Sequence, residues 1–380
     1  MKKYLVSAVP CADYDQRTVA MAMDAALGAI DGLDWVQSGM RVLIKANLVS
    51  ALKPNRAATT HPVLVCELTK RLMELGAQVV IGDSPGGFFT VAALNKVYNA
   101  TEMTLAEGLG AELNRNTDSH TIDIDGKVMH SLTYTSYIDR CDAIIDFCKL
   151  KSHGMVGMSG AVKNLYGVIP GLLKPETHYI YPDMDDFANM LVDINEHFKP
   201  VLTLVDAVVG MEGNGPTAGK PRKIGALIAS RSSYAADLVS AHIIGLEPMG
   251  IPTIRASIER GLIPSTYKDI PVFGDIEALR IKDFDVSAPK TVKFLGGQKH
   301  KLIQKFLEGC FTNTPMLKQS LCVGCRKCAD ICPAHAIEMR NNKPHIDRKK
   351  CIRCFCCQEF CPKAAMTVHR PFVAKMLQRK

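Results

Sequence analysis

Short apolar segments alternate along the first 290 residues with longer stretches whose apolar positions recur at helical spacing. Continuous apolar runs typical of buried strands cover residues 41–45, 78–82, 143–147, 201–206 and 224–229, and a short opening strand is expected within residues 1–10. Helical spacing covers residues 61–75, 185–198 and 234–244. Because strands alternate with helices of this length, we expect an α/β fold: a mainly parallel sheet with flanking helices.

Polar residues follow several of these strands, at the edge where open α/β sheets bind their ligands. We expect them to form a basic cleft for a small anionic substrate. The residues predicted to bind it are Lys45, Asn47, Asp83, Ser84, Lys149, Lys151, Lys163, Asn164 and Asn214. The candidates for acid–base catalysis are Glu212, His153 and Asp206. The sequence names no further cofactor for this cleft.

Each of these motifs also has a purely structural interpretation. The segment 82–87 is equally compatible with a turn in which Asp83 or Ser84 caps the next helix, and Lys149 and Lys151 with an exposed strand end. Familiar nucleotide loops are absent. Residues 210–215 read G-x-x-G-x-G, the reverse of the dinucleotide fingerprint, and Pro221 stands where a phosphate-binding loop needs Ser or Thr.

Cysteines are concentrated near the end of the chain. The 380 residues include 14 cysteines, nine of them between residues 322 and 361. Eight of these nine fit the spacing C-x2-C-x2-C-x3-C-P twice: Cys322, Cys325, Cys328 and Cys332, then Cys351, Cys354, Cys357 and Cys361. Clustered cysteines in a reducing compartment indicate metal rather than disulfides, and this repeated spacing resembles bacterial two-cluster ferredoxins.

The same resemblance assigns the ligands. Three closely spaced cysteines hold three irons of one [4Fe–4S] cluster, and the fourth cysteine of each run ligates the other cluster. One cluster is therefore assigned to Cys322, Cys325, Cys328 and Cys361, and the second to Cys351, Cys354, Cys357 and Cys332. Zinc fits this spacing poorly, because its sites pair two short arms with four ligands in all. Cys356 is expected to be an unligated neighbour.

Charge is distributed unevenly between the two parts of the chain. Residues 1–289 carry 27 Lys and Arg against 33 Asp and Glu, whereas residues 290–380 carry 19 against five. Two oxidised clusters with their thiolates would remove about four positive charges from the second part. The remaining excess predicts docking of an acidic redox protein, as electron donor or acceptor, and nucleic acid is the less favoured partner.

These patterns predict four segments. Residues 1–290 form the α/β domain, and 291–315 form a connecting helix whose basic residues lie within 296–309. Residues 316–370 form the ferredoxin-like domain, with a hairpin around Asn341 and Asn342, and 371–380 form a basic tail. The apolar content of 47% and charged content of 22% are those of a globular protein. No run approaches the length of a membrane span, and we expect a cytoplasmic protein.

Three strings of the first part together resemble a known family. They are residues 149–153 (KLKSH), 159–167 (SGAVKNLYG) and 210–216 (GMEGNGP). They are similar to the iron–sulfur-associated proteins called domain of unknown function 362, over about residues 1–290. The resemblance implies this architecture with an appended ferredoxin module, and it implies no particular reaction.

Three functions are compatible with these features. In the first, an oxidoreductase passes single electrons from the clusters to an anionic substrate or cofactor held by Lys149, Lys151 and Lys163, with Glu212 or His153 moving protons. In the second, the chain is an electron-transfer or maturation partner that reduces another protein. In the third, a non-redox α/β enzyme carries structural clusters.

Overall fold

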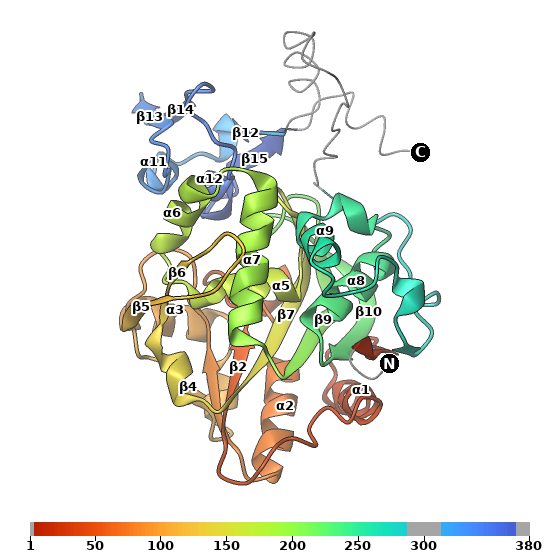
Figure 1. The fold of residues 1–380 in the computed structure, drawn as a ribbon. Helices are drawn as coiled ribbons and strands as arrows, with labels where there is room; N and C mark the ends of the chain where they lie inside the picture. Colours follow the sequence, from red (N-terminus) through yellow and green to blue (C-terminus); the bar gives the residue numbers. More distant parts are fainter. Residues whose placement is uncertain (1–3, 287–312, 370–380) are drawn as a thin grey trace.

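The computed structural model describes residues 4–286 and 313–369 (Figure 1). A central sheet with helices on both faces occupies the first range, and the second forms a small module at one end of that sheet. The predicted basic tail and most of the predicted connecting helix lie outside the described residues. Residues 314 and 315, which the sequence assigns to that helix, belong to the first strand of the module.

The large sheet, within the described residues, has nine strands in the order β11-β1-β10-β9-β7-β2-β3-β4, with β8 paired to β7. They are β1 (Val6–Pro10), β2 (Arg41–Ala46), β3 (Gln78–Gly82), β4 (Glu112–Leu113), β7 (Ala143–His153), β8 (Gly157–Ser159), β9 (Leu202–Glu212), β10 (Lys220–Ser230) and β11 (Val272–Phe273). Strands β9, β7, β2, β3 and β4 pair in parallel, whereas β10 is antiparallel to β9 and β1. The predicted α/β fold with a mainly parallel sheet is confirmed.

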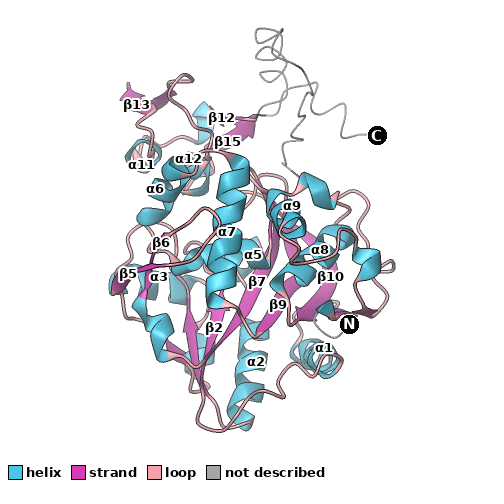
Figure 2. Cartoon of the chain, viewed as in Figure 1, coloured by secondary structure: helices cyan, strands magenta, loops and turns pink. Residues whose placement is uncertain are grey.

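Helices cover both faces of this sheet (Figure 2). They are α1 (Gln16–Gly28), α2 (Pro62–Glu74), α3 (Val91–Ala100), α4 (Thr104–Glu107), α5 (Ala161–Asn164), α6 (Leu173–Ile180), α7 (Met184–Phe198), α8 (Ser233–Ile243) and α9 (Pro252–Glu259). Shorter 3-10 helices are η2 (Pro54–Arg56), η3 (Ser136–Arg140), η4 (Leu165–Val168), η5 (Pro248–Gly250) and η6 (Tyr267–Asp269). A separate hairpin joins β5 (Ser119–Asp123) to β6 (Ser131–Thr135).

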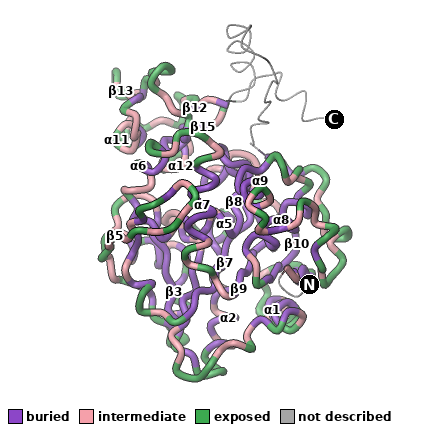
Figure 3. The backbone as a smooth tube through the Cα atoms, in the orientation of Figure 1, coloured by how far each residue is buried: buried purple, intermediate pink, exposed green. Residues whose placement is uncertain are grey.

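The alternation of side chains along the central strands divides the interior into two hydrophobic cores. On β2, Val42 and Ile44 pack in the core that holds α1 and α2, whereas Leu43 packs in the core that holds α7 and α8. Neighbouring residues of a strand point to opposite faces, so a strand buried on both faces is apolar throughout. This is why the central strands appear in the sequence as continuous apolar runs, and in Figure 3 as buried tube.

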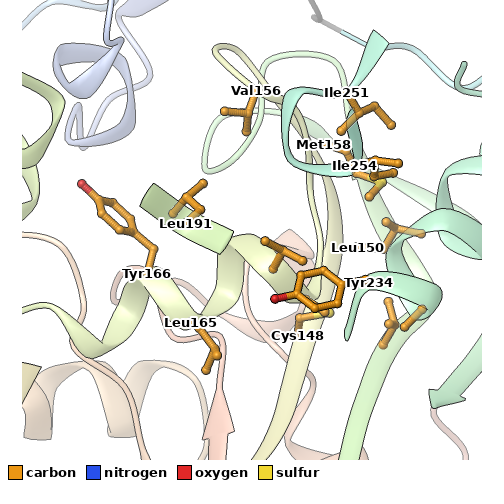
Figure 4. Close-up of a cluster of buried hydrophobic side chains, with 14 of the residues drawn as sticks. Cys148, Leu150, Val156, Met158, Leu165, Tyr166, Leu191, Tyr234, Ile251 and Ile254 are labelled. Atoms are coloured by element: carbon orange, nitrogen blue, oxygen red, sulfur yellow. The ribbon is translucent and has the colours of Figure 1, made fainter. Parts of the chain in front are cut away.

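The second of these cores is drawn in Figure 4. Cys148 and Leu150 of β7 face Leu191 of α7 and Tyr234 of α8, and all four are buried. Complete burial of a large apolar side chain contributes about 1.5–3 kcal/mol to stability. Helix α7 begins after Asp183, whose carboxylate accepts hydrogen bonds from the first backbone amides of the helix.

Residues 313–369 form a module of two small sheets and two short helices. Strand β12 (Thr314–Leu317) pairs with β15 (Met366–His369), and β13 (Ile337–Arg340) pairs with β14 (Lys343–Ile346). The helices are α11 (Lys327–Asp330) and α12 (Cys356–Glu359), and a 3-10 helix, η8, spans Gln319–Leu321. Asn341 and Asn342 both have positive φ, as the predicted two-residue turn requires.

Strands β7 and β9 extend beyond their predicted ends. The sequence predicts strands at 143–147 and 201–206, but β7 continues to His153 and β9 to Glu212. The interpretation of Lys149 and Lys151 as an exposed strand end is therefore wrong, because every residue of β7 is buried. The extensions carry polar side chains from the sheet toward the small module.

Candidate functional site

The candidate site lies at the carboxyl edge of the sheet, beneath the small module. Figure 1 shows α12 and β15 of the module facing this edge beside α6, while β13 and β14 lie farther out. Three strands of the parallel part of the sheet carry polar residues to this edge. Asn47 follows β2, Asp83 and Ser84 follow β3, and Lys149, Lys151 and His153 lie in the last part of β7. The edge holds two buried polar clusters of different composition.

The first, the Asp206 cluster, consists of Tyr14, His61, Lys149 and Asp206. Lys149 Nζ lies 2.8 Å from Asp206 Oδ2 and donates to Tyr14 Oη at 2.7 Å, while the Tyr14 hydroxyl donates to Asp206 Oδ1 at 2.9 Å. The His61 ring stacks on Tyr14 with ring centroids 3.5 Å apart, and burial lowers the pKa of His61 to about 4. The cluster is neutral overall, and its lysine and carboxylate neutralise each other.

A second neutral pair lies beside it. Lys45 Nζ is 2.9 Å from Asp83 Oδ1, and Asp83 Oδ2 accepts a hydrogen bond from the backbone amide of Leu48. Asp83 therefore does not cap the next helix, as the structural interpretation of the turn proposed, because α3 begins after Thr90, whose hydroxyl accepts from Ala93. The segment after β3 is held by a buried ion pair instead.

Asn164 and Asn47 connect this pair to Lys151. The Asn164 amide donates to Asp146 Oδ1 at 2.6 Å, and its carbonyl accepts from Asn47 Nδ2 at 2.8 Å. Asn47 Oδ1 in turn accepts from Lys151 Nζ at 2.7 Å. Burial raises the pKa of Asp146 to about 8, so that this carboxyl is mostly protonated at neutral pH. The chain of amides orients Lys151 without supplying a negative charge.

The second cluster, the lysine cluster, consists of Lys151, Lys163, Lys174, His153 and Glu359. Lys151 also donates to the carbonyl of Ala58, and Lys174 donates to the carbonyls of Ser84 and Ile169. Within the part of the chain that the structure describes, Lys163 Nζ makes no hydrogen bond or ion pair and lies 4.7 Å from the ring centroid of Tyr166.

His153 and Glu359 join the two parts of the molecule in this cluster. His153 Nδ1 accepts hydrogen bonds from the backbone amides of Met155 and Val156, which assigns the proton of the neutral ring to Nε2. That atom lies 3.0 Å from Glu359 Oε1 of α12. Although burial alone would raise it, the His153 ring and the Lys163 ammonium lower the pKa of Glu359 to about 2.

The charged groups of the lysine cluster influence one another's pKa values. Burial is the largest cause of the lowered pKa values of Lys151 and Lys174, each about 7, and it also lowers the pKa of His153. The charges of Lys163 and Glu359 act in addition on all three groups. One carboxylate therefore faces three lysines, and the cluster has a cationic excess when they are protonated.

The small module docks on this edge through α12 and β15. Phe355 belongs to the main core of the α/β part, and Phe360 packs so closely on Gly86 that a Cβ at that glycine would lie 2.7 Å from its ring. The Gln358 amide donates to the carbonyls of Asn214 and Gly215. The module is thus continuous with the large core rather than tethered to it.

The side chains of Glu212 and Asn214 make their contacts outside the lysine cluster. The Glu212 carboxylate, at the end of β9, accepts a hydrogen bond from the backbone amide of Asp285. Asn214 Oδ1 accepts from the backbone amide of Val368 in β15. The glycine-rich segment after β9 therefore holds the module in place, and the geometry gives neither residue a contact with Lys151, Lys163 or Lys174.

The cysteines of the module line two pockets. The first is lined by Cys322, Cys325, Cys328 and Cys361, and the second by Cys332, Cys351, Cys354 and Cys357. These are the two sets of four that the spacing predicts, and four thiolates around a cavity suit an iron–sulfur cube. Cys356 also lines the second cavity.

Several residues of the site escaped the sequence analysis. Lys174 and Tyr14 lie in no recognisable motif, and only the folding of distant segments places them here. Glu359 lies between Cys357 and Cys361, at a position that the cysteine spacing treats as arbitrary. A signal was present, because Glu359 is one of only five acidic residues after residue 289.

Models of two known protein families match the two parts of the chain. The model of a domain of unknown function, number 362, matches residues 42–242, and that of a 4Fe–4S dicluster domain matches residues 314–362. The chain belongs to the domain of unknown function 362 family. The predicted fusion with a 4Fe–4S domain is confirmed, and this family member is an iron–sulfur protein.

The chain is also similar to two individual proteins. A thylakoid-associated protein of Synechocystis sp. is 32% identical over 267 residues, which cover 68% of this chain and 80% of the relative. The lactate racemase apoprotein of Thermoanaerobacterium thermosaccharolyticum matches with a TM-score of 0.40 and 12% identity, over 62% of this chain and 56% of the racemase. In the residues that the structure describes, no helix has the length and apolar character needed to cross a membrane.

Proposed function

We propose that this family member is an oxidoreductase that carries two [4Fe–4S] clusters and delivers single electrons to a small anionic molecule at the lysine cluster. The clusters, when bound, supply one-electron transfer. The cysteines lining the two cavities would hold them, four to each. The chain's own residues do the rest: they bind the anion, exclude water and hold a proton beside it.

The observation that carries this proposal is the position of α12. One short segment contributes Cys354 and Cys357 to the second cavity, Phe355 to the core of the α/β part and Glu359 to the lysine cluster. The second cavity and the cationic cluster are therefore built from opposite sides of the same helical turn. A module that only stabilised the fold would not need to contribute a side chain to a polar cluster of the α/β part.

The lysine cluster suits an anion for electrostatic reasons. Lys163 has no partner among the described residues, and burial lowers its pKa, so the ammonium is costly in the absence of a negative ligand. His153 holds a proton at Nε2, which lies 3.0 Å from the Glu359 carboxylate. We therefore assign anion binding to Lys151 and Lys163 and proton transfer to His153.

This assignment changes the roles expected from the sequence. Asp206 and Lys149 neutralise each other in the Asp206 cluster, Lys45 and Asp83 form a second pair, and Glu212 binds a backbone amide. We propose structural roles for these five residues. Asn164 and Asn47 orient Lys151 through their amides, and Asn214 docks the module.

An acidic redox protein is the proposed electron donor. The first cavity lies on the outer part of the module, where Cys325 is exposed and Arg326, Lys327 and Lys363 contribute to the lining. A basic rim around an exposed cluster ligand favours docking of an acidic surface. We place the protein in the cytoplasm, whose reducing conditions keep the thiolates available. Association with thylakoids is stated of the cyanobacterial relative alone.

An anaerobic preparation tests the redox part of this proposal. We expect about eight irons per chain and a reversible change in absorbance and EPR spectrum on reduction, as two [4Fe–4S] clusters require. A content of about four irons, or clusters that stay in one oxidation state across the physiological potential range, would contradict it. The second outcome would favour the non-redox enzyme with structural clusters.

The acceptor is then sought by following reoxidation of the photoreduced protein. A protein-free filtrate of a cell extract should reoxidise it, and Lys163→Met should slow this step about tenfold or more, because a hydrogen bond to a charged group is lost. Lys268→Met removes an exposed lysine of η6 and is the matched control. Reoxidation by the protein fraction alone would instead favour the relay that reduces another protein.

A further inference from the structure

We propose that the ligand of the lysine cluster carries a dianionic phosphate group, bound between Lys151, Lys163 and Lys174. This inference rests on the proposed function, because it names the chemical class of the anion that the cluster receives. Neither the family nor its relatives' names assign such a site. Three features support it: the charges that face one another in the cluster, the donors left without partners among the described residues, and the side on which the cluster meets solvent.

The charge count favours two negative charges over one. Lys45 and Lys149 are each paired with a carboxylate, whereas Lys151, Lys163 and Lys174 face Glu359 as their only charged acidic neighbour within the cluster. When all three ammonium groups are protonated, as a bound dianion favours, they and the one carboxylate leave an excess of two positive charges. A phosphate monoester carries about 1.5–2 negative charges near neutral pH, whereas a single carboxylate carries one.

The available donors fit oxygen atoms arranged around one centre. The Lys163 ammonium has no hydrogen-bond or ion-pair partner within residues 4–286 and 313–369. The Ser84 hydroxyl is buried and likewise without a partner in those ranges, and the carbonyl of the same residue accepts from Lys174. Lys151 keeps one donor beyond the two used by Asn47 and Ala58, since an ammonium has three.

The cluster is buried on one side and accessible on the other. Lys151 and His153 are each 1% exposed, whereas Lys163, Lys174 and Gly86 are partly exposed. A phosphate can therefore reach Lys163 and Lys174 from solvent, with Lys151 at the inner end.

Proton uptake is a consequence that can be measured. Without a ligand, burial lowers the pKa values of Lys151 and Lys174 to about 7. The charged neighbours acting on these two lysines are Lys45, Asp83, Lys149, Lys163 and Glu359. A bound dianion raises both pKa values, so binding at pH 8 should take up protons from the solution.

Calorimetry with inorganic phosphate tests the proposal on the oxidised, cluster-loaded protein at constant ionic strength. We expect saturable binding, and a heat that differs between buffers of different ionisation enthalpy by the amount that proton uptake requires. Lys163→Met should weaken phosphate binding at least tenfold, and Lys268→Met should leave it unchanged. Succinate and acetate are the competing probes, and tighter binding of either would overturn the choice of phosphate.

A second measurement on the unaltered protein covers the case in which Lys163→Met fails to load clusters. Reduced, paramagnetic clusters should broaden the 31P resonance of bound phosphate, and this broadening should vanish when excess phosphomonoester displaces it. No binding of phosphate by the loaded protein, or binding without broadening, would overturn the site. Neither measurement involves turnover, so a failure here leaves the reoxidation experiment to decide the proposed function separately.

Discussion

The Asp206 cluster and the lysine cluster lie at the same edge of the sheet, and β7 contributes to both, yet they differ in how their charges are compensated. In the Asp206 cluster, Lys149 has Asp206 at 2.8 Å and Tyr14 at 2.7 Å. In the lysine cluster, the described residues offer the Lys163 ammonium only the face of the Tyr166 ring. We therefore propose two uses of buried charge here: one cluster stabilises the fold, and the other holds uncompensated charge for a ligand.

The two clusters also differ in whether the small module contributes a side chain to them. The Asp206 cluster is complete within residues 4–286, whereas the lysine cluster acquires its only charged carboxylate, Glu359, from the module. Docking thus places one negative charge and the second cysteine-lined cavity at the same edge. A polar cluster that is finished by another segment is a better functional candidate than one that is satisfied locally.

We expect the largest loss of stability from a substitution that removes the charge of Asp206. Asp206→Asn leaves the Lys149 ammonium buried without a carboxylate, and we expect a loss of about 3–5 kcal/mol in the free energy of unfolding. Anaerobic chemical denaturation measures it. Asp24→Asn is the matched control, because the exposed Asp24–Arg71 pair contributes about 0–1 kcal/mol. Equal losses in the two variants would refute the structural role of the Asp206 cluster.

Removal of the aromatic anchor should come next. Phe355→Ala deletes a buried side chain of the shared core and is expected to cost about 3 kcal/mol, with the loss measured on the unfolding of the α/β part as well as the module. Phe88→Ala, at a position 75% exposed, is the control and should cost less than 1 kcal/mol. Separate unfolding of the module, with the α/β part unaffected, would disprove the continuous core.

The pH dependence of stability tests whether the Lys151 ammonium lacks a compensating charge. Burial lowers the pKa of Lys151 to about 7, so between pH 7 and the ordinary value of 10.5 the unfolded chain binds more protons than the folded one. Stability from this group therefore rises with pH across that window. The free energy of unfolding of the native protein minus that of Lys151→Met should increase from pH 7 to pH 9. A flat difference would mean that Lys151 is compensated after all.

The smallest expected effect concerns docking. Asn214→Ala removes the acceptor for the backbone amide of Val368 and should cost about 1 kcal/mol. Hydrogen exchange of that amide should accelerate, while exchange in β2 stays the same. Glu212→Gln, two residues earlier, keeps an oxygen for the amide of Asp285 and should leave the Val368 amide protected. Acceleration in both variants would indicate a general loosening of the segment.

Local patterns in the sequence predict the central strands and the helices α2, α7 and α8, but not where the strands end. The apolar run at 143–147 predicts a strand, yet β7 continues through Lys149, Lys151 and His153, whose polarity suggests an exit from the sheet. Buried partners from distant segments, such as Asp206 and Asn47, make this extension stable. A pattern based on neighbouring residues cannot contain those partners, because they are 57 and 104 positions away along the chain.

Two properties were readable from the printed residues alone: the α/β order of the first part and the two sets of four cysteines. Both depend on short, regular spacing, since strand periodicity and the three closely spaced cysteines of each run involve residues close in sequence, and the second run repeats the first. The tertiary structure alone decided which lysines are neutralised and that Glu359 completes the site. Electrostatic compensation acts through space at a few ångströms, so five similar lysines acquire different roles from whatever the fold brings beside them.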